Sequence, residues 1–330
     1  MISQTNRKTA NGTQDSENLK SPATENKTGK RIIIYLSVTF LMTYLYEIGI
    51  VWPAVKSVNL LISTLSQLLI GAAMFFPALG VLITRLVTKE GFQNSMIRPN
   101  LKGHMLYYIM AWFGPSILIA IGALIYFLLY PAAFDPSMSD MLNLLKEQAL
   151  ASGAAASSLS AISPIVFYVQ LVFAILFAPI LNIVTCFGEE WGWRGYLLPK
   201  MQENLPLLPM LLINGIIWGL WHAPLTIIGH NYGLDYPGFP YIGILAMCLF
   251  CTVIGILFSY VTIKTGSCLP AALAHGALNG FVSAPSFFTK AGFGNPFIGP
   301  LSTGIIGGIG FVFAAVVALV LLFKEGKKGM

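Results

Sequence analysis

Long apolar runs constrain this sequence more than any other feature. A helix needs about 20 residues to cross a hydrocarbon core of about 30 Å. Runs of at least that length follow one another along the chain, at 31–53, 58–86, 104–130, 164–202, 209–229, 241–263, 266–287 and 298–323. The sequence therefore predicts an all-α, polytopic membrane protein with about eight transmembrane helices and the lipid bilayer around it.

The composition agrees with a membrane location. Only 10% of the residues are charged and 56% are hydrophobic, whereas a soluble domain carries about 25% charged residues. The net charge of +6 could suggest a nucleic-acid partner, but the basic residues lie in short loops and tails and form no basic helix. We therefore expect no nucleic-acid partner.

The basic residues also predict how the chain is threaded. If the N-terminus is cytoplasmic and the number of helices is even, sixteen of the nineteen Lys and Arg residues lie on the cytoplasmic side. Only Lys56, Lys146 and Lys290 lie on the outer side. Because Lys and Arg concentrate in cytoplasmic loops, we expect a multi-pass protein of the cell membrane with both termini in the cytoplasm.

The runs divide the chain into four parts. The first 30 residues are polar, with almost no large apolar groups, which predicts a disordered tail and not a signal peptide. The longest internal loop contains helical spacing at 140–150, which predicts a short amphipathic helix on the outer surface. We expect a cytoplasmic tail at 1–30, transmembrane helices and an outer loop at 31–163, a core of transmembrane helices with the polar motifs described below at 164–287, and a last helix with a basic tail at 288–330.

The run at 164–202 is too long for one straight crossing. We expect Pro179 and Gly188 to bend it, or its first turns to lie at the membrane interface.

Several ionisable or reactive residues within the runs have an ordinary structural interpretation. Glu47 lies near the outer end of the first run, where its carboxylate can reach the interface. His104 and His230 fall at span ends or in loops, and we interpret them as interfacial residues. Cys248 and Cys251 form a CxxC motif inside an apolar run, where small packing residues are expected and not redox or metal-binding groups.

Three clusters of polar residues inside the runs have no such explanation, because an unpaired charge in a span is costly. The first contains Glu189, Glu190 and Arg194, in CFGEEWGWRGYLLPK. Glu190 and Arg194 are four residues apart and can pair, whereas Glu189 points about 100° away from Glu190 and has no partner on its own helix. A carboxylate without a cation in such a site is a candidate general base.

The other two clusters lie on later runs. Trp218 and His222 share a helix face in IIWGLWHAPL, and His275 and Asn279 share one in CLPAALAHGALNGF. Counted along the helices from the cytoplasmic side, Glu189 and both histidines lie about 14–20 Å deep. We therefore expect the clusters to meet within the bilayer, around a wet cavity that opens toward the cytoplasm.

These side chains suit the hydrolysis of an amide by an activated water molecule. Glu189, helped by His222, can orient and deprotonate the water. His275 and Asn279 can donate hydrogen bonds to the oxyanion of the tetrahedral intermediate. The supporting residues are Glu190, Arg194 and Trp218.

In this order, the three motifs resemble the CPBP family of intramembrane proteases, which comprises the type II CAAX prenyl endopeptidases and the bacteriocin-processing Abi proteins. The motifs read EEWGWR at 189–194, WGLWH at 218–222 and HGALN at 275–279, and the resemblance covers about 182–285. The family commonly has Phe where this chain has Trp218. The resemblance implies an endopeptidase in which Glu189 activates water and whose substrate is a membrane-associated protein or peptide, either a prenylated CaaX tail or a peptide precursor.

The cofactor and two other functions stay open. Glu189, His222 and His275 could supply three zinc ligands, and relatives have been described as metalloproteases. The chain has no HExxH motif, and the sequence identifies no partner for the second nitrogen of either histidine, so we favour a mechanism without a metal. The alternatives to a protease are an ion- or proton-coupled transporter, for which inverted repeats are missing, and a catalytically silent membrane scaffold or immunity protein.

Overall fold

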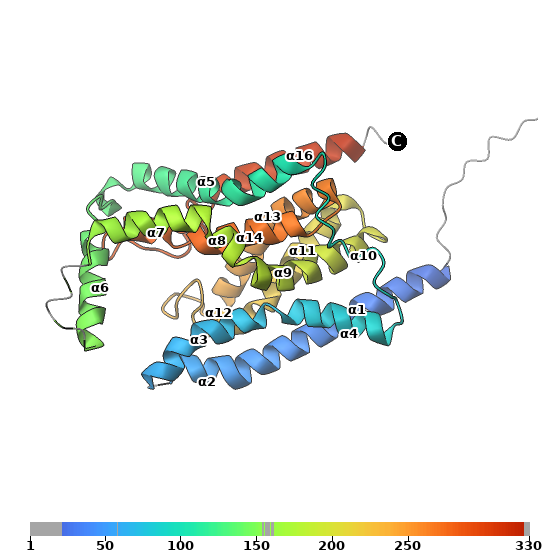
Figure 1. The fold of residues 1–330 in the computed structure, drawn as a ribbon, viewed down its shortest axis with the longest axis horizontal. Helices are drawn as coiled ribbons and strands as arrows, with labels where there is room; N and C mark the ends of the chain where they lie inside the picture. Colours follow the sequence, from blue (N-terminus) through green and yellow to red (C-terminus); the bar gives the residue numbers. More distant parts are fainter. Residues whose placement is uncertain (1–21, 58, 154, 156–158, 160–161, 327–330) are drawn as a thin grey trace, which may run out of the picture.

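The regular secondary structure in the described part of the chain is helical (Figure 1). The computed structural model describes residues 22–57, 59–153, 155, 159 and 162–326. The predicted all-α class is therefore confirmed. In chain order the helical elements are α1 (Pro22–Tyr46), η1 (Glu47–Val51), α2 (Trp52–Val55), α3 (Leu60–Ala73), α4 (Phe76–Val87), α5 (Met105–Leu129), η2 (Pro131–Ala133), α6 (Ser139–Ala151), α7 (Pro164–Leu176), α8 (Ala178–Leu181), α9 (Ile183–Gly192), η4 (Trp193–Leu197), α10 (Leu198–Gln202), α11 (Leu207–Trp221), α12 (Ala223–Ile227), α13 (Tyr241–Thr265), α14 (Leu269–Phe281), α15 (Ala284–Phe287) and α16 (Ile309–Gly326).

Within the described residues, four helical segments are long and apolar enough to cross a membrane. Two shorter apolar helices, α7 and α11, accompany them. Many large apolar side chains on these helices face outward, as lipid-facing side chains do. This architecture is consistent with a multi-pass membrane protein, while the number of about eight crossings stays a prediction. The four segments are Lys27–Val55, Leu65–Val87, Met105–Leu129 and Tyr241–Thr265.

The long run at 164–202 is broken into five consecutive helical elements, from α7 to α10. Pro179 occupies the first turn of α8, directly after the end of α7, as expected for a residue that lacks a backbone donor. Gly188, by contrast, lies inside α9 and does not interrupt it. A Cβ atom there would lie 2.7 Å from the carbonyl oxygen of Met74, so this glycine allows α9 to pack closely on the end of α3.

The start of the first helix differs from the predicted tail. Residues 1–21 of that tail lie outside the described residues, but α1 already begins at Pro22. Proline is favoured at the first turn of a helix, and the following residues include the good helix formers Ala, Glu and Lys. The hydroxyl of Thr28 also donates to Glu203 Oε2 at 2.6 Å, which ties this extension to the end of α10.

The predicted amphipathic helix in the outer loop is present as α6. Leu142 on this helix packs against a small apolar cluster that includes Phe167. Before the helix, Asp135 accepts hydrogen bonds from the hydroxyls of Ser137 at 2.5 Å and Ser139 at 2.7 Å. The bond from Ser137, with that from Ser139, outweighs the effect of burial and holds the pKa of Asp135 well below its usual range.

Close packing of α11 on α13 forms the centre of the molecule. A Cβ atom at Gly215 would lie 2.4 Å from Cα of Thr252, and one at Gly219 would lie 2.3 Å from Cα of Cys248. Only glycine permits this approach, as is typical of small residues between membrane helices. The contact fixes the end of α11, where two of the predicted site residues lie.

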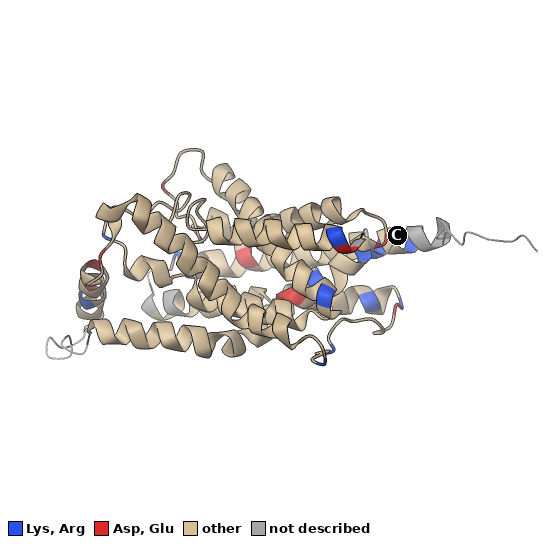
Figure 2. Ribbon diagram, turned by 90° about the horizontal axis from the view of Figure 1, so that it is seen from above, with Lys and Arg blue, Asp and Glu red and all other residues tan. Residues whose placement is uncertain are grey.

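Most of the Lys and Arg residues lie at one end of the helices, which we call the basic end (Figure 2). This end contains the start of α1 with Arg31, the end of α10 with Lys200 and the last turn of α13 with Lys264. The helix α16 also finishes there, so the described chain begins and ends at the same end (Figure 1). The opposite end contains α2 and α6. The assignment of the basic end to the cytoplasm stays a prediction.

Candidate active site

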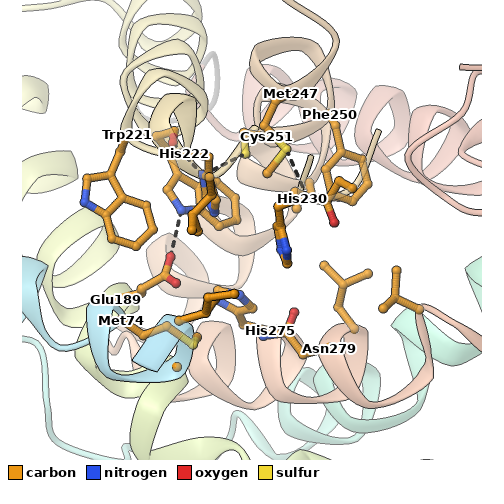
Figure 3. Close-up of a pocket in the computed structure, with 18 of the residues that line it drawn as sticks. Met74, Glu189, Trp221, His222, His230, Met247, Phe250, Cys251, His275 and Asn279 are labelled. Carbon is orange, nitrogen blue, oxygen red and sulfur yellow. Dashed lines mark hydrogen bonds between the residues drawn. The ribbon is translucent and has the colours of Figure 1, made fainter. Parts of the chain in front are cut away.

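A cavity of about 550 Å³ lies between α3, α9, α11, α13, α14 and the loop after α12. Five residues from the three predicted clusters line it: Glu189, Trp218, His222, His275 and Asn279 (Figure 3). The structure therefore brings together clusters that are up to 90 residues apart in the sequence, counting from Glu189 to Asn279. The volume of this cavity lies within the range of about 300–1,000 Å³ that is typical of ligand pockets.

Glu189 lies in the wall of this cavity, on α9, and is only 2% exposed. The indole nitrogen of Trp218 donates a hydrogen bond to its Oε2 atom at 2.9 Å (Figure 3). Among the described residues, this is the one hydrogen bond that the carboxylate accepts, so Oε1 is available to a molecule in the cavity. The indole thus orients Glu189 without neutralising it.

Glu190, on the neighbouring face of α9, takes part in a buried charge cluster. Nη1 of Arg194 lies 3.0 Å from Glu190 Oε2, which confirms the predicted pair. The same carboxylate also lies 2.9 Å from Nδ1 of His275, through Oε1. The guanidinium of Arg194 in turn lies over the ring of Trp218, 4.1 Å from its centroid. Glu190 therefore links α9 to α14, a role in positioning His275 that sequence spacing did not predict.

His222 occupies the position where α11 ends. The next residues, starting at Ala223 with Pro224 in the first turn, form the separate short helix α12. Nδ1 of His222 lies 2.9 Å from the carbonyl oxygen of Trp218. Because a carbonyl only accepts, Nδ1 carries the proton and Nε2 is the nitrogen left for other partners.

Asn279 follows His275 by one helical turn on α14, and both side chains face the cavity (Figure 3). The amide nitrogen of Asn279 lies 3.7 Å from the sulfur of Cys186, which is a weak acceptor. The amide therefore has no strong partner among the described residues and can donate to a group in the cavity.

The arrangement of these residues bears on the zinc alternative in two ways. Both histidines do have a partner at the second nitrogen, a carbonyl for His222 and a carboxylate for His275, so the argument that such partners were missing was wrong. However, no three or more His, Cys, Asp or Glu side chains in the described part of the chain are grouped so that they could hold a metal ion. A zinc site at Glu189, His222 and His275 therefore has no support from this arrangement, and the mechanism without a metal stays a prediction.

Comparisons with known proteins find similarity in the part of the chain that carries the three motifs. The family profile described as "Type II CAAX prenyl endopeptidase Rce1-like" matches residues 164–281. Residues 164–281 form an Rce1-like domain. Over 58 residues the chain is also 36% identical to "CAAX prenyl protease 2" of Methanococcus maripaludis. That match covers 17% of this chain and 21% of the relative.

The Rce1-like domain does not enclose the cavity alone. Gln67 and Met74, on the chain segment from α3 to its C-cap, and Thr303, in the loop before α16, also line it. Neither segment carries a motif in the sequence, so only the packing of α3 against the domain reveals their place. An intramembrane polar residue such as Gln67 was the one available signal.

The structure adds to the interpretation of two residues. His230 lies in a loop, as predicted, but it also lines the cavity of the Rce1-like domain (Figure 3). The carboxylate of Glu47 does not extend out of the protein, as the sequence interpretation required. It is 1% exposed in the π-helical turn η1, and neither carboxylate oxygen has a hydrogen-bond partner within the described residues. A linear hydropathy pattern does not show which neighbours fold over a residue.

The cavity lies toward the end that is opposite to the basic end. In α13 the lining residues run from Met247 to Ile254, whereas Lys264 lies in the last turn at the basic end. In α14, which starts at the basic end, they run from His275 onward. With the predicted threading, the cavity of the Rce1-like domain lies on the outer side of Glu189. The expectation that it opens toward the cytoplasm is therefore not supported.

Proposed function

We propose that this chain is a membrane endopeptidase that hydrolyses a peptide bond of a membrane-associated protein or peptide. The observation that carries the proposal is the convergence of Glu189, His222, His275 and Asn279 on one cavity, from three different helical segments. The Rce1-like domain at 164–281 supports the same reaction class. A prenylated CaaX tail and an unmodified peptide precursor are both candidate substrates.

In the proposed reaction Glu189 acts as the general base. Its Oε2 atom is held by Trp218, and its Oε1 atom accepts a proton from a water molecule in the cavity, which is oriented with the help of Nε2 of His222. The resulting hydroxide adds to the carbonyl carbon of the scissile peptide bond. The carbonyl oxygen becomes the oxyanion of a tetrahedral intermediate.

His275 and Asn279 would stabilise that oxyanion. Glu190 fixes the orientation of His275 through Nδ1, so the protonated ring presents Nε2–H to the cavity. The amide of Asn279, one turn away, supplies a second donor. When the C–N bond breaks, the proton on Glu189 passes to the leaving nitrogen, which leaves a free carboxyl group on one product and a free amine on the other.

The test is a proteomic comparison of membrane fractions from cells that carry the wild type, a deletion, Glu189→Ala or Glu189→Gln, at matched protein abundance. If the chain is a protease, cells with the deletion and cells with either Glu189 variant should accumulate the same uncleaved precursors. As a matched control we use Glu325→Gln, which removes a carboxylate of the exposed ion pair with Lys264. If the deletion changes the proteome but both Glu189 variants match the wild type, the chain is a scaffold or immunity protein and not a protease.

A further inference from the structure

The loop between α12 and α13 brings a third histidine into the cavity. His230 lies in this loop, eight residues after His222, and its ring faces the space between His222 and Asn279 (Figure 3). It belongs to none of the three motifs that define the site. Its position in the wall therefore calls for a separate explanation.

Backbone and side-chain contacts hold the loop in place independently of the His230 ring. Gly229 and Asn231, on either side, adopt left-handed conformations with φ of +97° and +68°, which Gly and Asn tolerate best. The backbone nitrogen of His230 donates to Leu225 O at 3.0 Å. Tyr232 is buried and its ring stacks on Phe297 with centroids 5.1 Å apart.

The His230 ring itself has no hydrogen bond or ion pair with any described residue. It is half-buried, so part of its surface faces the cavity. The loop is held in place by other contacts, and both nitrogens of the His230 ring are available to hydrogen-bond a molecule in the cavity. An imidazole that served only the loop would be bonded within the loop.

Polar side chains outside the three motifs also line the cavity. Beside Glu189, His222, His275 and Asn279, which make up the catalytic set, they include Gln67 on α3 and the neighbouring pair His230 and Asn231. No Lys or Arg lines the cavity among the residues that the structure describes.

We propose that His230 is a substrate-contacting residue that hydrogen-bonds the backbone of the bound peptide next to the scissile bond. A peptide whose carbonyl lies against His275 and Asn279 has its neighbouring amide groups directed across the cavity, where His230 can donate to a C=O or accept from an N–H. The backbone of a peptide is polar but uncharged, so it suits a cavity lining without Lys or Arg. This inference rests on the proposed endopeptidase function and names a binding residue for it.

The experiment extends the membrane proteomics to His230→Leu, His230→Gln and Tyr232→Phe, at matched abundance with Glu189→Gln. Leu removes the donor and acceptor, whereas Gln retains both. Tyr232→Phe is the control in the same loop, because the Tyr232 hydroxyl has no hydrogen-bond partner within the described residues. A synthetic peptide that spans the cleavage site of the most accumulated precursor then serves as the probe for KM and kcat with the purified full chain in detergent.

The inference predicts that His230→Leu accumulates the same precursors as Glu189→Gln, and that its KM for the probe rises about tenfold with a smaller change in kcat, as for one lost hydrogen bond. His230→Gln should recover most of the affinity, and Tyr232→Phe should behave as wild type. If Glu189→Gln accumulates precursors and His230→Leu does not, His230 has no role and the protease stands. If neither variant accumulates precursors, the proposed function fails and this inference fails with it. If His230→Leu lowers thermal stability and His230→Gln does not restore KM, the residue is structural.

Discussion

The central helices differ between their two halves. Toward the basic end they are closed: Trp193 and Tyr196 are almost fully buried, and the indole of Trp191 donates to Ser95 O at 3.1 Å. Toward the opposite end the same helices separate around the cavity. Aromatic side chains fill the half at the basic end. The half around the cavity contains polar side chains that form few hydrogen bonds with one another.

The charge cluster of Glu190, Arg194 and His275 lies at the boundary between these halves. Each of its members is at most 5% exposed, and each has a partner of complementary charge or hydrogen-bonding capacity. The closed half therefore serves as a rigid support that orients His275 for the open half. The same helices therefore contain two distinct environments, a closed half and an open half, and four measurements test this difference.

The largest expected effect is all-or-none labelling of introduced cysteines. In intact cells, an impermeant thiol reagent should label Gln67→Cys, in the cavity, and should label Arg98→Cys, in the loop near the basic end, only after the cells are permeabilised. The reason is that the cavity lies away from the basic end and Lys and Arg concentrate in the cytoplasm. The four native cysteines are buried, but Cys251 also lines the cavity, so labelling of the chain without an introduced cysteine gives the background. The reverse labelling pattern would show that the cavity is reached from the cytoplasm.

Removal of Glu190 should cause the largest loss of stability. Glu190→Ala leaves the buried Arg194 cation without its partner, which typically costs about 3–5 kcal/mol. Thermal unfolding of the purified protein measures the change. Glu47→Gln is the matched comparison, because the carboxylate of Glu47 is equally buried but has no hydrogen-bond partner in the described residues. We expect this variant to be no less stable than wild type, and equal losses for both would refute the supporting role of the charge cluster.

Replacement of Trp218 by Phe should reduce activity without abolishing it. Phe keeps an aromatic ring beneath Arg194 but cannot donate to Glu189 Oε2. Loss of a hydrogen bond to a charged group typically costs about 1.5–3 kcal/mol, so we expect kcat to fall about 10- to 150-fold. Turnover of the probe peptide by Trp218→Phe and wild type gives this ratio. An unchanged kcat would mean that the indole does not orient the catalytic carboxylate.

The smallest effect concerns an ion-pair network at the basic end. Burial alone would raise the pKa of Glu90, but hydrogen bonds from Lys200 at 2.7 Å and Tyr196 at 2.9 Å outweigh it and lower this pKa below its usual value. A lowered pKa in the folded state stabilises the fold above the ordinary carboxyl pKa of about 4.3, and this contribution disappears as the pH falls through the folded value.

Glu90→Gln should therefore lower stability by about 1 kcal/mol or less near pH 7. The difference from wild type should vanish in acid, in unfolding curves recorded from about pH 7 downward through the carboxyl pKa of about 4.3. A difference that persists below that range would assign the effect to packing and not to charge.

Hydropathy and motif order in the sequence were sufficient for much of this description. The apolar runs predicted the helices, because a backbone in lipid must bond internally. The spacing of Glu190 and Arg194 predicted their pair, because residues four apart share a helix face. The three motifs also predicted the family resemblance, over about 182–285, and the family profile matches residues 164–281.

Local sequence could not show contacts between distant segments. The partner of Glu189 is Trp218, the partner of His275 is Glu190, and His230 enters the cavity from a loop. Each of these depends on how helices pack, for example on Gly219, which brings α11 against α13. The position of the cavity relative to the basic end also followed from packing, which depth counted along single helices does not show.

The sequence by itself determined that the chain is helical and apolar, which residues could carry chemistry, and which pair on one helix could form. Only the tertiary structure decided which nitrogen of each histidine is occupied, which residues support Glu189, and that His230 and Gln67 face the same cavity. The physical reason is that hydropathy and helical periodicity act between residues a few positions apart, whereas a site is formed by side chains whose distances are set by the packing of whole helices.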